Sequence, residues 1–288
     1  MNLTFFAIIP KNLESFFFGV VTRIKLPIPI ANLLNRWFAS YFRLQMSEAE
    51  KPLEAYRTLE DLFTRRLKPG LRPLEGPFIS PCDAMFRSSE PLLDGSALQA
   101  KGIRYSVKTL LYGTEAPPQT NFHPSWACSL YLAPHNYHRV HAPFTGQILS
   151  VQYIPGKLWP VNDTFTGKIP NLFCENERVV FSLQHEGGGL AYLVMVGAFH
   201  VGRIQIAHAP NFASNLLRSH CYQKGYPRYL DLPKRNIQVG DEIGTFLLGS
   251  SVILVLDRMI QERFSLKKIE RPTPVKMGQN LGIIPQVV

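Results

Sequence analysis

The sequence predicts an α+β fold, in which N-terminal amphipathic helices precede a β-rich domain of the sandwich or barrel type. Apolar residues recur at helical spacing in residues 1–46, whereas from about residue 75 onward short β-like runs alternate with turn residues. The 23 prolines and 20 glycines also favour a fold with many turns over a helix bundle. We therefore expect a helical region over residues 1–70 and a β-rich domain over residues 71–288.

The first 46 residues are rich in aromatic side chains and are interrupted by basic ones. Pro27 and Pro29 separate two helical pieces, because proline does not fit the interior of a helix. Helical spacing places four side chains of the second piece on one side: Leu34, Trp37, Phe38 and Tyr41. Such a face suits either an interfacial helix on an anionic membrane or a helix docked against a protein core, and the pattern alone leaves both open.

The next segment, residues 47–67, predicts one further helix or a helix pair. Ser47 can cap its N-terminus, with Glu50 three residues later in the capping-box arrangement. The β-like runs that follow are QILSVQYI, RVVFSLQH, LAYLVMVGAF and SVILVL, and turn sequences such as PGK, GGG and VGDEIG separate them. We expect each of these runs to form a strand of the β-rich domain.

The chain carries a formal net charge of +10, from 31 Lys and Arg against 21 Asp and Glu. A basic excess favours an anionic partner, either nucleic acid or acidic lipid. The sequence has no block of five like charges and no zinc-finger spacing that would point to nucleic acid. No uncharged apolar run reaches the roughly 18 residues of a spanning helix, and Lys11 follows the first apolar stretch instead of preceding it. We therefore expect neither a spanning helix nor a signal peptide.

Three histidines fall together in the segment LAPHNYHRVHAP: His135, His138 and His141. Residues three apart point to opposite faces of an extended segment, so the three rings do not readily converge on a metal ion. No H-E-x-x-H motif supports zinc either, and we expect no metal. A histidine pair also suits general acid–base chemistry, because imidazole titrates near neutral pH. The alternative for each ring is a hydrogen-bonded structural role.

The stretch LLGSSVILVL places Gly249 and Ser250 directly before an apolar run. A tight turn that feeds a buried strand is the simplest interpretation. Asp83 in FISPCDAMF, which fits an Asx-turn equally well, and His141 would complete a Ser-His-Asp triad with Ser250. The chain lacks a G-x-S-x-G elbow. Ser250 is therefore better placed to attack its own neighbour, the uncrowded Gly249 carbonyl, than an external ester.

Eight segments follow one another in order between about Leu59 and Leu256. They are FTRRLKPGLRP, SPCDA, KGIRYSVKTLLYG, YLAPHNYHRVHAPFTGQI, YIPGKLWPVN, IPNLFCENERVV, VGAFHVGRI and GDEIGTFLLGSSVILVL. In this order they resemble the phosphatidylserine decarboxylase proenzymes, and the compact length resembles the bacterial form. The resemblance implies a pyruvoyl-dependent carboxy-lyase of phospholipid biosynthesis, which converts phosphatidylserine to phosphatidylethanolamine and CO2.

The resemblance further implies that the precursor cleaves itself. The family's motif of glycine, serine and then serine or threonine falls on Gly249, Ser250 and Ser251. This implies autocatalytic serinolysis between Gly249 and Ser250, which would yield a β chain of residues 1–249 and an α chain of residues 250–288. Ser250 would become the covalent pyruvoyl cofactor and the Schiff-base site, in place of pyridoxal phosphate as the electron sink.

The resemblance also assigns the acid and the histidines. The family aspartate falls on Asp83, which implies a charge relay with His141 during self-cleavage, and the other histidine of Y-H-R-V-H falls on His138. His138 is the candidate proton donor for decarboxylation. Two positions depart from the family pattern: Ala84 stands where glycine is usual, and Asn136 stands where aspartate is usual. Neither departure removes a group with an assigned role, but the first puts the loop geometry around Asp83 in doubt.

A phospholipid substrate implies further partners. We expect an anionic phospholipid membrane, peripheral attachment at the cytoplasmic side of the cell membrane, and no nucleic acid, which favours the interfacial interpretation of residues 1–46. Arg178 and Lys101 are basic candidates for the head-group phosphate, with structural pairing as the alternative for each. The sequence leaves open whether the chain forms a homodimer. Two other classes also stay open: a serine hydrolase acting on an external ester, and a basic non-enzymatic module that binds lipid or nucleic acid.

Overall fold

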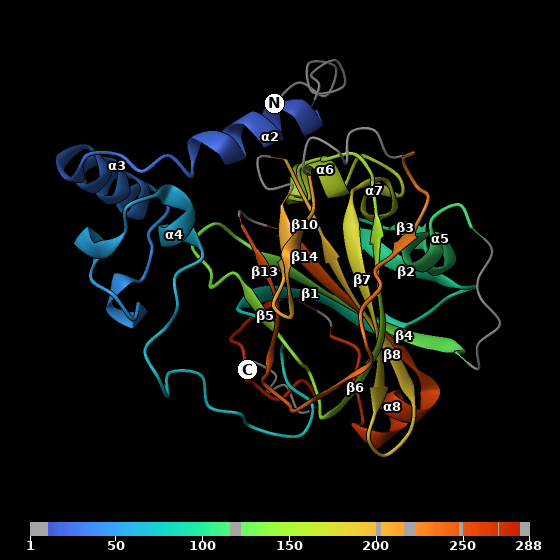
Figure 1. The fold of residues 1–288 in the computed structure, drawn as a ribbon. Coiled ribbons are helices and arrows are strands. Elements are labelled where there is room, and N and C mark those ends of the chain that lie inside the picture. Colours follow the sequence, from blue (N-terminus) through green and yellow to red (C-terminus); the bar gives the residue numbers. More distant parts are fainter. Residues whose placement is uncertain are drawn as a thin grey trace.

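The computed structural model describes residues 11–115, 122–199, 203–215, 223–247, 250–269 and 271–282. Three helices come first: α2 (Lys11–Val21), α3 (Ile28–Tyr41) and α4 (Leu59–Phe63). Figure 1 shows α3 and α4 beside a β-rich body, with α2 reaching from them across to it. At the start of α2, the Asn12 amide donates to the Gly156 carbonyl (2.7 Å), and the Lys11 ammonium lies 4.0 Å from the ring centroid of Trp159. These contacts tie the helical part to the body.

The two long helices form as the prolines predict. Pro29 stands in the first turn of α3, where its missing amide hydrogen leaves no carbonyl unpaired. The short helix α4 is capped by Thr58, whose Oγ1 accepts a hydrogen bond from the Asp61 amide (3.0 Å). The buried side chains of this part form a small apolar core: Phe38, Ala39, Leu44, Tyr56, Leu62 and Phe63. The predicted break between two helices at Pro27 and Pro29 is confirmed.

Residues 47–67 differ from the prediction, because only Leu59–Phe63 forms an α-helix there. Two single 3-10 turns, η1 (Met46–Glu48) and η2 (Leu53–Ala55), precede α4. Pro52 lies between them, and proline both lacks an amide hydrogen and disfavours helical geometry in the residue before it. The cap predicted at Ser47 is therefore wrong, and the helix that does form begins after Thr58.

A large antiparallel sheet forms the centre of the body, in the order β11-β6-β7-β8-β14-β4-β1-β15. Its strands are β1 (Ala84–Pro91), β4 (Pro124–Leu132), β6 (Gly146–Ile154), β7 (Arg178–His185), β8 (Leu190–Val196), β11 (Arg228–Tyr229), β14 (Ser250–Asp257) and β15 (Thr273–Val275), and β12 (Arg235–Ile237) also pairs with β6. The four predicted runs correspond to β6, β7, β8 and β14, so these strand predictions are confirmed.

A smaller sheet packs on one face of the large one, in the order β10-β9-β13-β5. Its strands are β5 (Arg139–His141), β9 (Ile204–Ile206), β10 (Ala209–Ala213) and β13 (Glu242–Phe246). Side chains from both sheets share one core, in which Val140, Ile206 and Phe246 pack with Leu193 and Val252. The arrangement is sandwich-like and does not close into a barrel over the described residues, so the sandwich alternative of the predicted α+β fold is confirmed.

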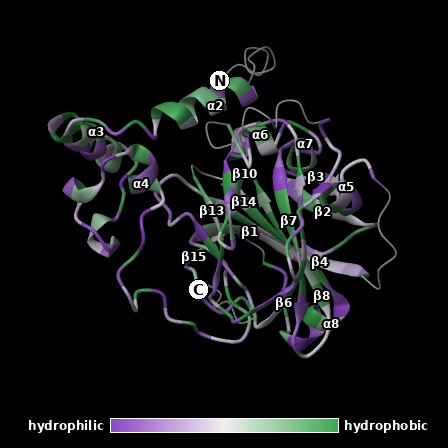
Figure 2. Cartoon of the chain, viewed as in Figure 1, coloured by the Kyte–Doolittle hydropathy of each residue, from purple (hydrophilic) through white to green (hydrophobic). Residues whose placement is uncertain are grey.

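Strand β14 lies in the middle of the large sheet and is buried on both faces. Val252 and Leu254 face the core shared with the small sheet, whereas Ile253 and Val255 face a second core beneath α5 (Val107–Tyr112), α6 (Asp163–Thr166) and α7 (Leu172–Glu175). Burial on both faces explains why this strand reads as a continuous apolar run instead of an alternating one. Figure 2 shows apolar residues in the central strands and also along α2.

Candidate active site

Ser250 stands at the head of the central strand. It is the first residue of β14 and pairs with Leu132, the last residue of β4. Its side chain is completely buried, and its Oγ has no hydrogen-bond partner among the described residues. Buried hydroxyls are nearly always paired, so this oxygen is available for another role. Gly249, the other half of the predicted cleavage point, lies outside the described residues.

The topology brings the histidine segment to Ser250. In the large sheet Leu132 pairs with Ser250, and in the small sheet the His138 carbonyl accepts the Phe246 amide (3.0 Å). The Leu132–Ser250 pair and the His138–Phe246 contact are therefore joined twice along the chain. One connection runs from Leu132 to His138 and the other from Phe246 to Ser250. Ser250 is four positions after Phe246, which keeps their Cα atoms within about 14 Å.

His138 is fully buried and neutral. Its Nδ1 lies 2.8 Å from the Asn136 carbonyl, so the neutral ring carries its proton on Nδ1 and presents a lone pair at Nε2. That Nε2 has no partner among the described residues, and the Phe63 ring lies against the imidazole, 3.9 Å between centroids. Burial, together with the nearby Arg65 charge, lowers the pKa of His138 to about 3. The ring is thus a base with a free acceptor.

His141 is held in the same tautomer by different groups. Its Nδ1 donates to the Gly240 carbonyl (2.7 Å), and its Nε2 accepts from the Tyr137 hydroxyl (3.1 Å). Burial lowers the pKa of His141, and burial also raises the pKa of Tyr137 to about 12, so the hydroxyl keeps its proton. The orientation that we expected from Asp83 is supplied in this structure by the Gly240 carbonyl.

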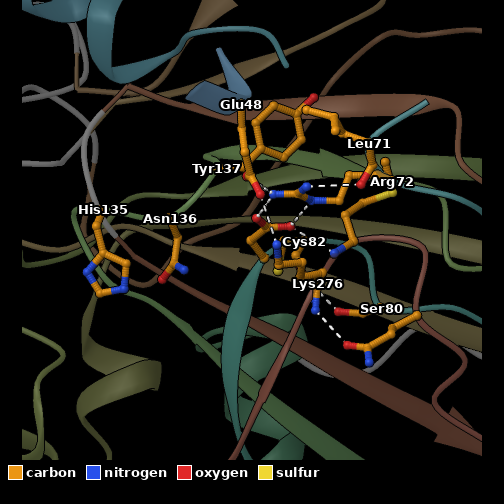
Figure 3. Close-up of polar contacts among 12 residues, drawn as sticks. Glu48, Leu71, Arg72, Ser80, Cys82, His135, Asn136, Tyr137 and Lys276 are labelled. Atoms are coloured by element: carbon orange, nitrogen blue, oxygen red, sulfur yellow. Dashed lines mark hydrogen bonds and ion pairs between the residues drawn. The ribbon is translucent and has the colours of Figure 1, made fainter. Parts of the chain in front are cut away.

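Asp83 is buried and bonds to an arginine. The Arg72 guanidinium donates from Nε to Oδ1 (2.9 Å) and from Nη2 to Oδ2 (2.6 Å), and the Met277 amide donates to Oδ1 (2.9 Å). Arg72 also donates to Glu48 (2.6 Å), which in turn pairs with Lys276 (2.9 Å) (Figure 3). The structure therefore does not bring the Asp83 carboxylate into a hydrogen bond with His141.

The two predicted residues are nevertheless neighbours. The His141 amide donates to the Pro81 carbonyl (2.8 Å), two residues before Asp83. The negative charge of Asp83 is also close enough to favour the protonated form of His141 and thereby oppose the lowering of its pKa by burial. Asp83 can thus stabilise an imidazolium through its charge without touching the ring.

Two adjoining cavities open beside these groups. One of about 460 Å³ is lined by Arg65, Arg72, Asp83 and Tyr137, and one of about 280 Å³ is lined by Arg72, Tyr137 and His141. Tyr137, whose hydroxyl binds His141, and Arg72 line both cavities. Figure 3 shows Tyr137 beside Arg72, with His135 and Asn136 set apart from that cluster.

Sequence reasoning missed three functional neighbours: Arg65, Arg72 and Tyr137. All three lie inside segments that carried the family resemblance, FTRRLKPGLRP and APHNYHRVHAP, where clustered arginines and a tyrosine between histidines were the available signal. The residues that departed from the family pattern fit their places. Asn136 closes its loop by accepting the Ala133 amide at Oδ1 (2.8 Å), and Ala84 is the first residue of β1.

The other candidates from the sequence lie in different settings. His135 is exposed, and within the described ranges no group of three His, Cys, Asp or Glu side chains is arranged to hold a metal ion. Arg178 is fully buried, and its guanidinium donates to the carbonyls of Thr109, Leu110, Cys174 and Asn176. All these contacts fit the structural role of Arg178 that the sequence left open as the alternative to phosphate binding. Lys101 is exposed at the turn between β2 (Ser96–Ala100) and β3 (Ile103–Ser106).

The fold and the site together define a class of protein: a sandwich-like α+β enzyme with a buried serine at the head of its central strand and, one short connection away, a segment that carries two neutral imidazoles. The model of the phosphatidylserine decarboxylase family matches residues 59–283. The chain therefore belongs to the phosphatidylserine decarboxylase family, a family of carboxy-lyases, and the resemblance seen in the sequence is confirmed.

Three relatives support this assignment, each named phosphatidylserine decarboxylase proenzyme. The protein of Myxococcus xanthus (strain DK1622) is 35% identical over 283 residues, which cover 96% of each chain. That of Brevibacillus brevis is 33% identical over 95% of this chain and 92% of its own length. That of Pseudomonas fluorescens is 37% identical over 88% of this chain and 86% of its own. In the part of the chain that the structure describes, no helix has the length and apolar character needed to cross a membrane.

Proposed function

We propose that the chain is a precursor that cuts itself between Gly249 and Ser250, and that the mature enzyme decarboxylates phosphatidylserine to phosphatidylethanolamine. The observation that carries the proposal is the Ser250 hydroxyl, buried and unpartnered at the head of β14 and one short connection away from the histidine segment. Membership of a decarboxylase family argues against a serine hydrolase that acts on an external ester. Family membership argues against a basic module without enzymatic activity.

Self-cleavage needs a base, a nucleophile and an adjacent carbonyl. His141 takes the Ser250 hydroxyl proton, and Asp83 stabilises the resulting imidazolium by its charge. The oxygen attacks the Gly249 carbonyl carbon, the C–N bond breaks, and an ester replaces the amide. Loss of the Ser250 α-proton then expels the Gly249 carboxylate. The remaining dehydroalanine tautomerises and reacts with one water, which releases one ammonia and leaves a pyruvoyl group at residue 250.

The surroundings of Ser250 fit such a group. Its ketone and amide carbonyl would supply the electron sink that decarboxylation of an α-amino acid requires. The chain's own contribution is a position sheltered from bulk solvent, since Ser250 is completely buried. His138 is our candidate to relay a proton to the α-carbon: its free Nε2 can take up the proton that decarboxylation consumes, which solvent supplies, and the Asn136 carbonyl fixes the orientation of the ring at Nδ1.

The substrate requires contact with a membrane, and we assign it to α2 and α3. Large apolar side chains of this part are exposed, including Leu33 at 72% and Tyr41 at 68%. The set comprises Leu13, Phe17, Val20, Val21, Ile24, Ile28, Ile30, Leu33, Trp37 and Tyr41. An apolar face on a chain of net charge +10 suits the surface of an anionic bilayer. We therefore propose a peripheral enzyme at the cytoplasmic side of the cell membrane, with phosphatidylserine and anionic lipid as partners.

The intact mass of the purified protein tests the proposal. The wild-type chain should appear as two chains that separate after Gly249, and the Ser250→Ala variant should stay whole. The α chain should be lighter by one ammonia than a chain with an N-terminal serine, which distinguishes a pyruvoyl group from simple hydrolysis. Ser251→Ala serves as the matched control and should still be cut. A whole and active wild-type chain would refute the proposal; a cut chain should release CO2 from phosphatidylserine vesicles.

A further inference from the structure

We propose that Arg65 binds the phosphodiester of the phospholipid head group, an inference that rests on the proposed function. Arg65 lies two positions after the end of α4. The end of α4 and the two residues after it contact the histidine segment in three successive places. The Phe63 ring lies on the His138 ring, the Thr64 carbonyl accepts from Arg139 Nε (3.1 Å), and Arg65 Nη2 donates to the His135 carbonyl (2.9 Å). The guanidinium is thereby fixed beside His138.

Arg65 is a buried cation without a counterion. It is 4% exposed, its Nε and Nη1 have no hydrogen-bond partner, and it forms no ion pair within the described ranges. The carboxylates of Glu48 and Asp83 lie in the same cavity but are already bound to Arg72. A buried charge is expensive unless it is paired and hydrogen-bonded.

Arg178 shows what a purely structural buried arginine looks like in this chain. All three nitrogens of its guanidinium donate, to four backbone carbonyls in total, whereas the guanidinium of Arg65 has one firm acceptor, and Arg65 is among the residues that line a cavity of about 460 Å³. The free Nε–H and Nη1–H groups of Arg65 can each donate a charge-assisted hydrogen bond to an oxygen of a phosphate or carboxylate. The geometry thus points to an anionic ligand.

The substrate carries two anionic groups, and the chemistry of the reaction distinguishes them. The carboxylate loses its charge as CO2 departs, so a cation paired with it would stabilise the ground state more than the transition state and slow the reaction. The phosphodiester keeps its charge throughout, so pairing with it strengthens binding without opposing the chemistry. It is also only two atoms from the α-carbon, which is the carbon that His138 is proposed to protonate. Neighbouring residues can therefore contact both.

Binding to the uncleavable precursor tests the inference independently of self-cleavage. In the Ser250→Ala background, the probes are glycerophosphoethanolamine, which has a phosphodiester and no carboxylate, and L-serine, which has a carboxylate and no phosphate. Adding Arg65→Met should weaken the affinity for glycerophosphoethanolamine by about 10- to 100-fold, the range expected for charge-assisted hydrogen bonds, and leave that for L-serine unchanged. Arg65→Lys should restore part of the loss, and the exposed Arg258→Met should change neither.

Each other outcome would overturn the inference. Weakened binding of L-serine alone would assign Arg65 to the carboxylate, and unchanged binding of both probes would assign it a structural role. Absence of glycerophosphoethanolamine binding by the Ser250→Ala parent would also refute it. Where Arg65→Met does not fold, the same comparison made with Arg65→Lys decides. In mature enzyme the inference predicts a raised KM with kcat little changed, the signature of binding that is equal in ground and transition states.

Discussion

Glu177 shows how a single buried residue can make the whole fold sensitive to pH. Its carboxyl accepts hydrogen bonds from Ser214 (2.8 Å) and Tyr153 (3.0 Å), and no cation pairs with it in the described part of the chain. Burial outweighs these bonds and raises the pKa of Glu177 to about 8. The folded protein therefore keeps a proton on Glu177 over a pH range in which the unfolded chain has released it.

Replacing Glu177 with glutamine should remove this part of the pH dependence. Between the ordinary glutamate value of 4.5 and a pH of about 8, only the folded state binds the proton, so its contribution to stability is complete below 4.5 and falls as the pH rises. The slope is about 1.4 kcal/mol per pH unit. We expect the stability of Ser250→Ala protein relative to its Glu177→Gln derivative, measured by urea denaturation, to fall from pH 5 to pH 8.

The exposed Glu186 supplies the control for this experiment, since Glu186→Gln should leave the profile unchanged. Parallel curves for the Glu177→Gln derivative and its parent would contradict a neutral buried carboxyl. The two proteins must be compared with each other because His138 changes the stability with pH in the opposite direction to Glu177. Its lowered pKa makes stability fall as the pH drops from 6.5 towards 3.

The residue types of the candidate site could be predicted, but their partners could not. Ser250, His138 and His141 stand in short local motifs, and a motif can be read without the fold. The groups that set their protonation come from distant segments: the Gly240 carbonyl is 99 residues from His141, and the Arg65 charge acts across 73 positions on His138. The Asp83 interaction was mispredicted in detail for the same reason, because Arg72 competes for the carboxylate.

At the level of elements, α3 divides its apolar residues between two faces. Ala31, Phe38 and Ala39 are buried, Phe38 and Ala39 in the core that they share with α4, whereas Leu33 and Trp37 point to solvent. The core-docking interpretation therefore holds for one face of α3, and the membrane contact that we propose falls on the opposite face. The predicted stripe of Leu34, Trp37, Phe38 and Tyr41 is split, since Phe38 belongs to the core face and Trp37 and Tyr41 stack on the other.

The outward face of α3 should determine binding to anionic vesicles. Burial of a large apolar side chain contributes about 1.5–3 kcal/mol, so Leu33→Ser or Trp37→Ser should each weaken partition into phosphatidylserine-containing vesicles by about tenfold or more. Sedimentation with the vesicles measures this without requiring activity. The matched control is Leu93→Ser, which removes a side chain that is 59% exposed at the turn between β1 and β2, and Figure 1 shows β2 well away from α3. Equal sedimentation of all variants would contradict the assigned membrane surface.

At the scale of the whole molecule, the order of strands could not be predicted, although most strands could. Apolar runs and turn residues mark where a strand begins and ends, but the partners of β14 come from segments centred more than 50 and more than 120 residues earlier in the chain, β8 and β4. Pairing over such distances depends on the packing of both sheet faces together. It is this order that puts the proposed cleavage point at the head of a strand with neighbours on both sides.

The order of strands also predicts that self-cleavage does not separate the chains. The proposed α chain begins with β14, which is hydrogen-bonded to β8 on one side and β4 on the other, and both its faces are buried. The later part of the α chain is also bound to the β chain, since the Met277 amide donates to Asp83 and Lys276 pairs with Glu48. Fully cut wild-type protein should therefore elute from a sizing column as one species at the volume of uncut Ser250→Ala, and the two chains should part only in denaturant. Elution of a free α chain from cut protein in native buffer would show that the ladders on both sides of β14 are not sufficient to hold it.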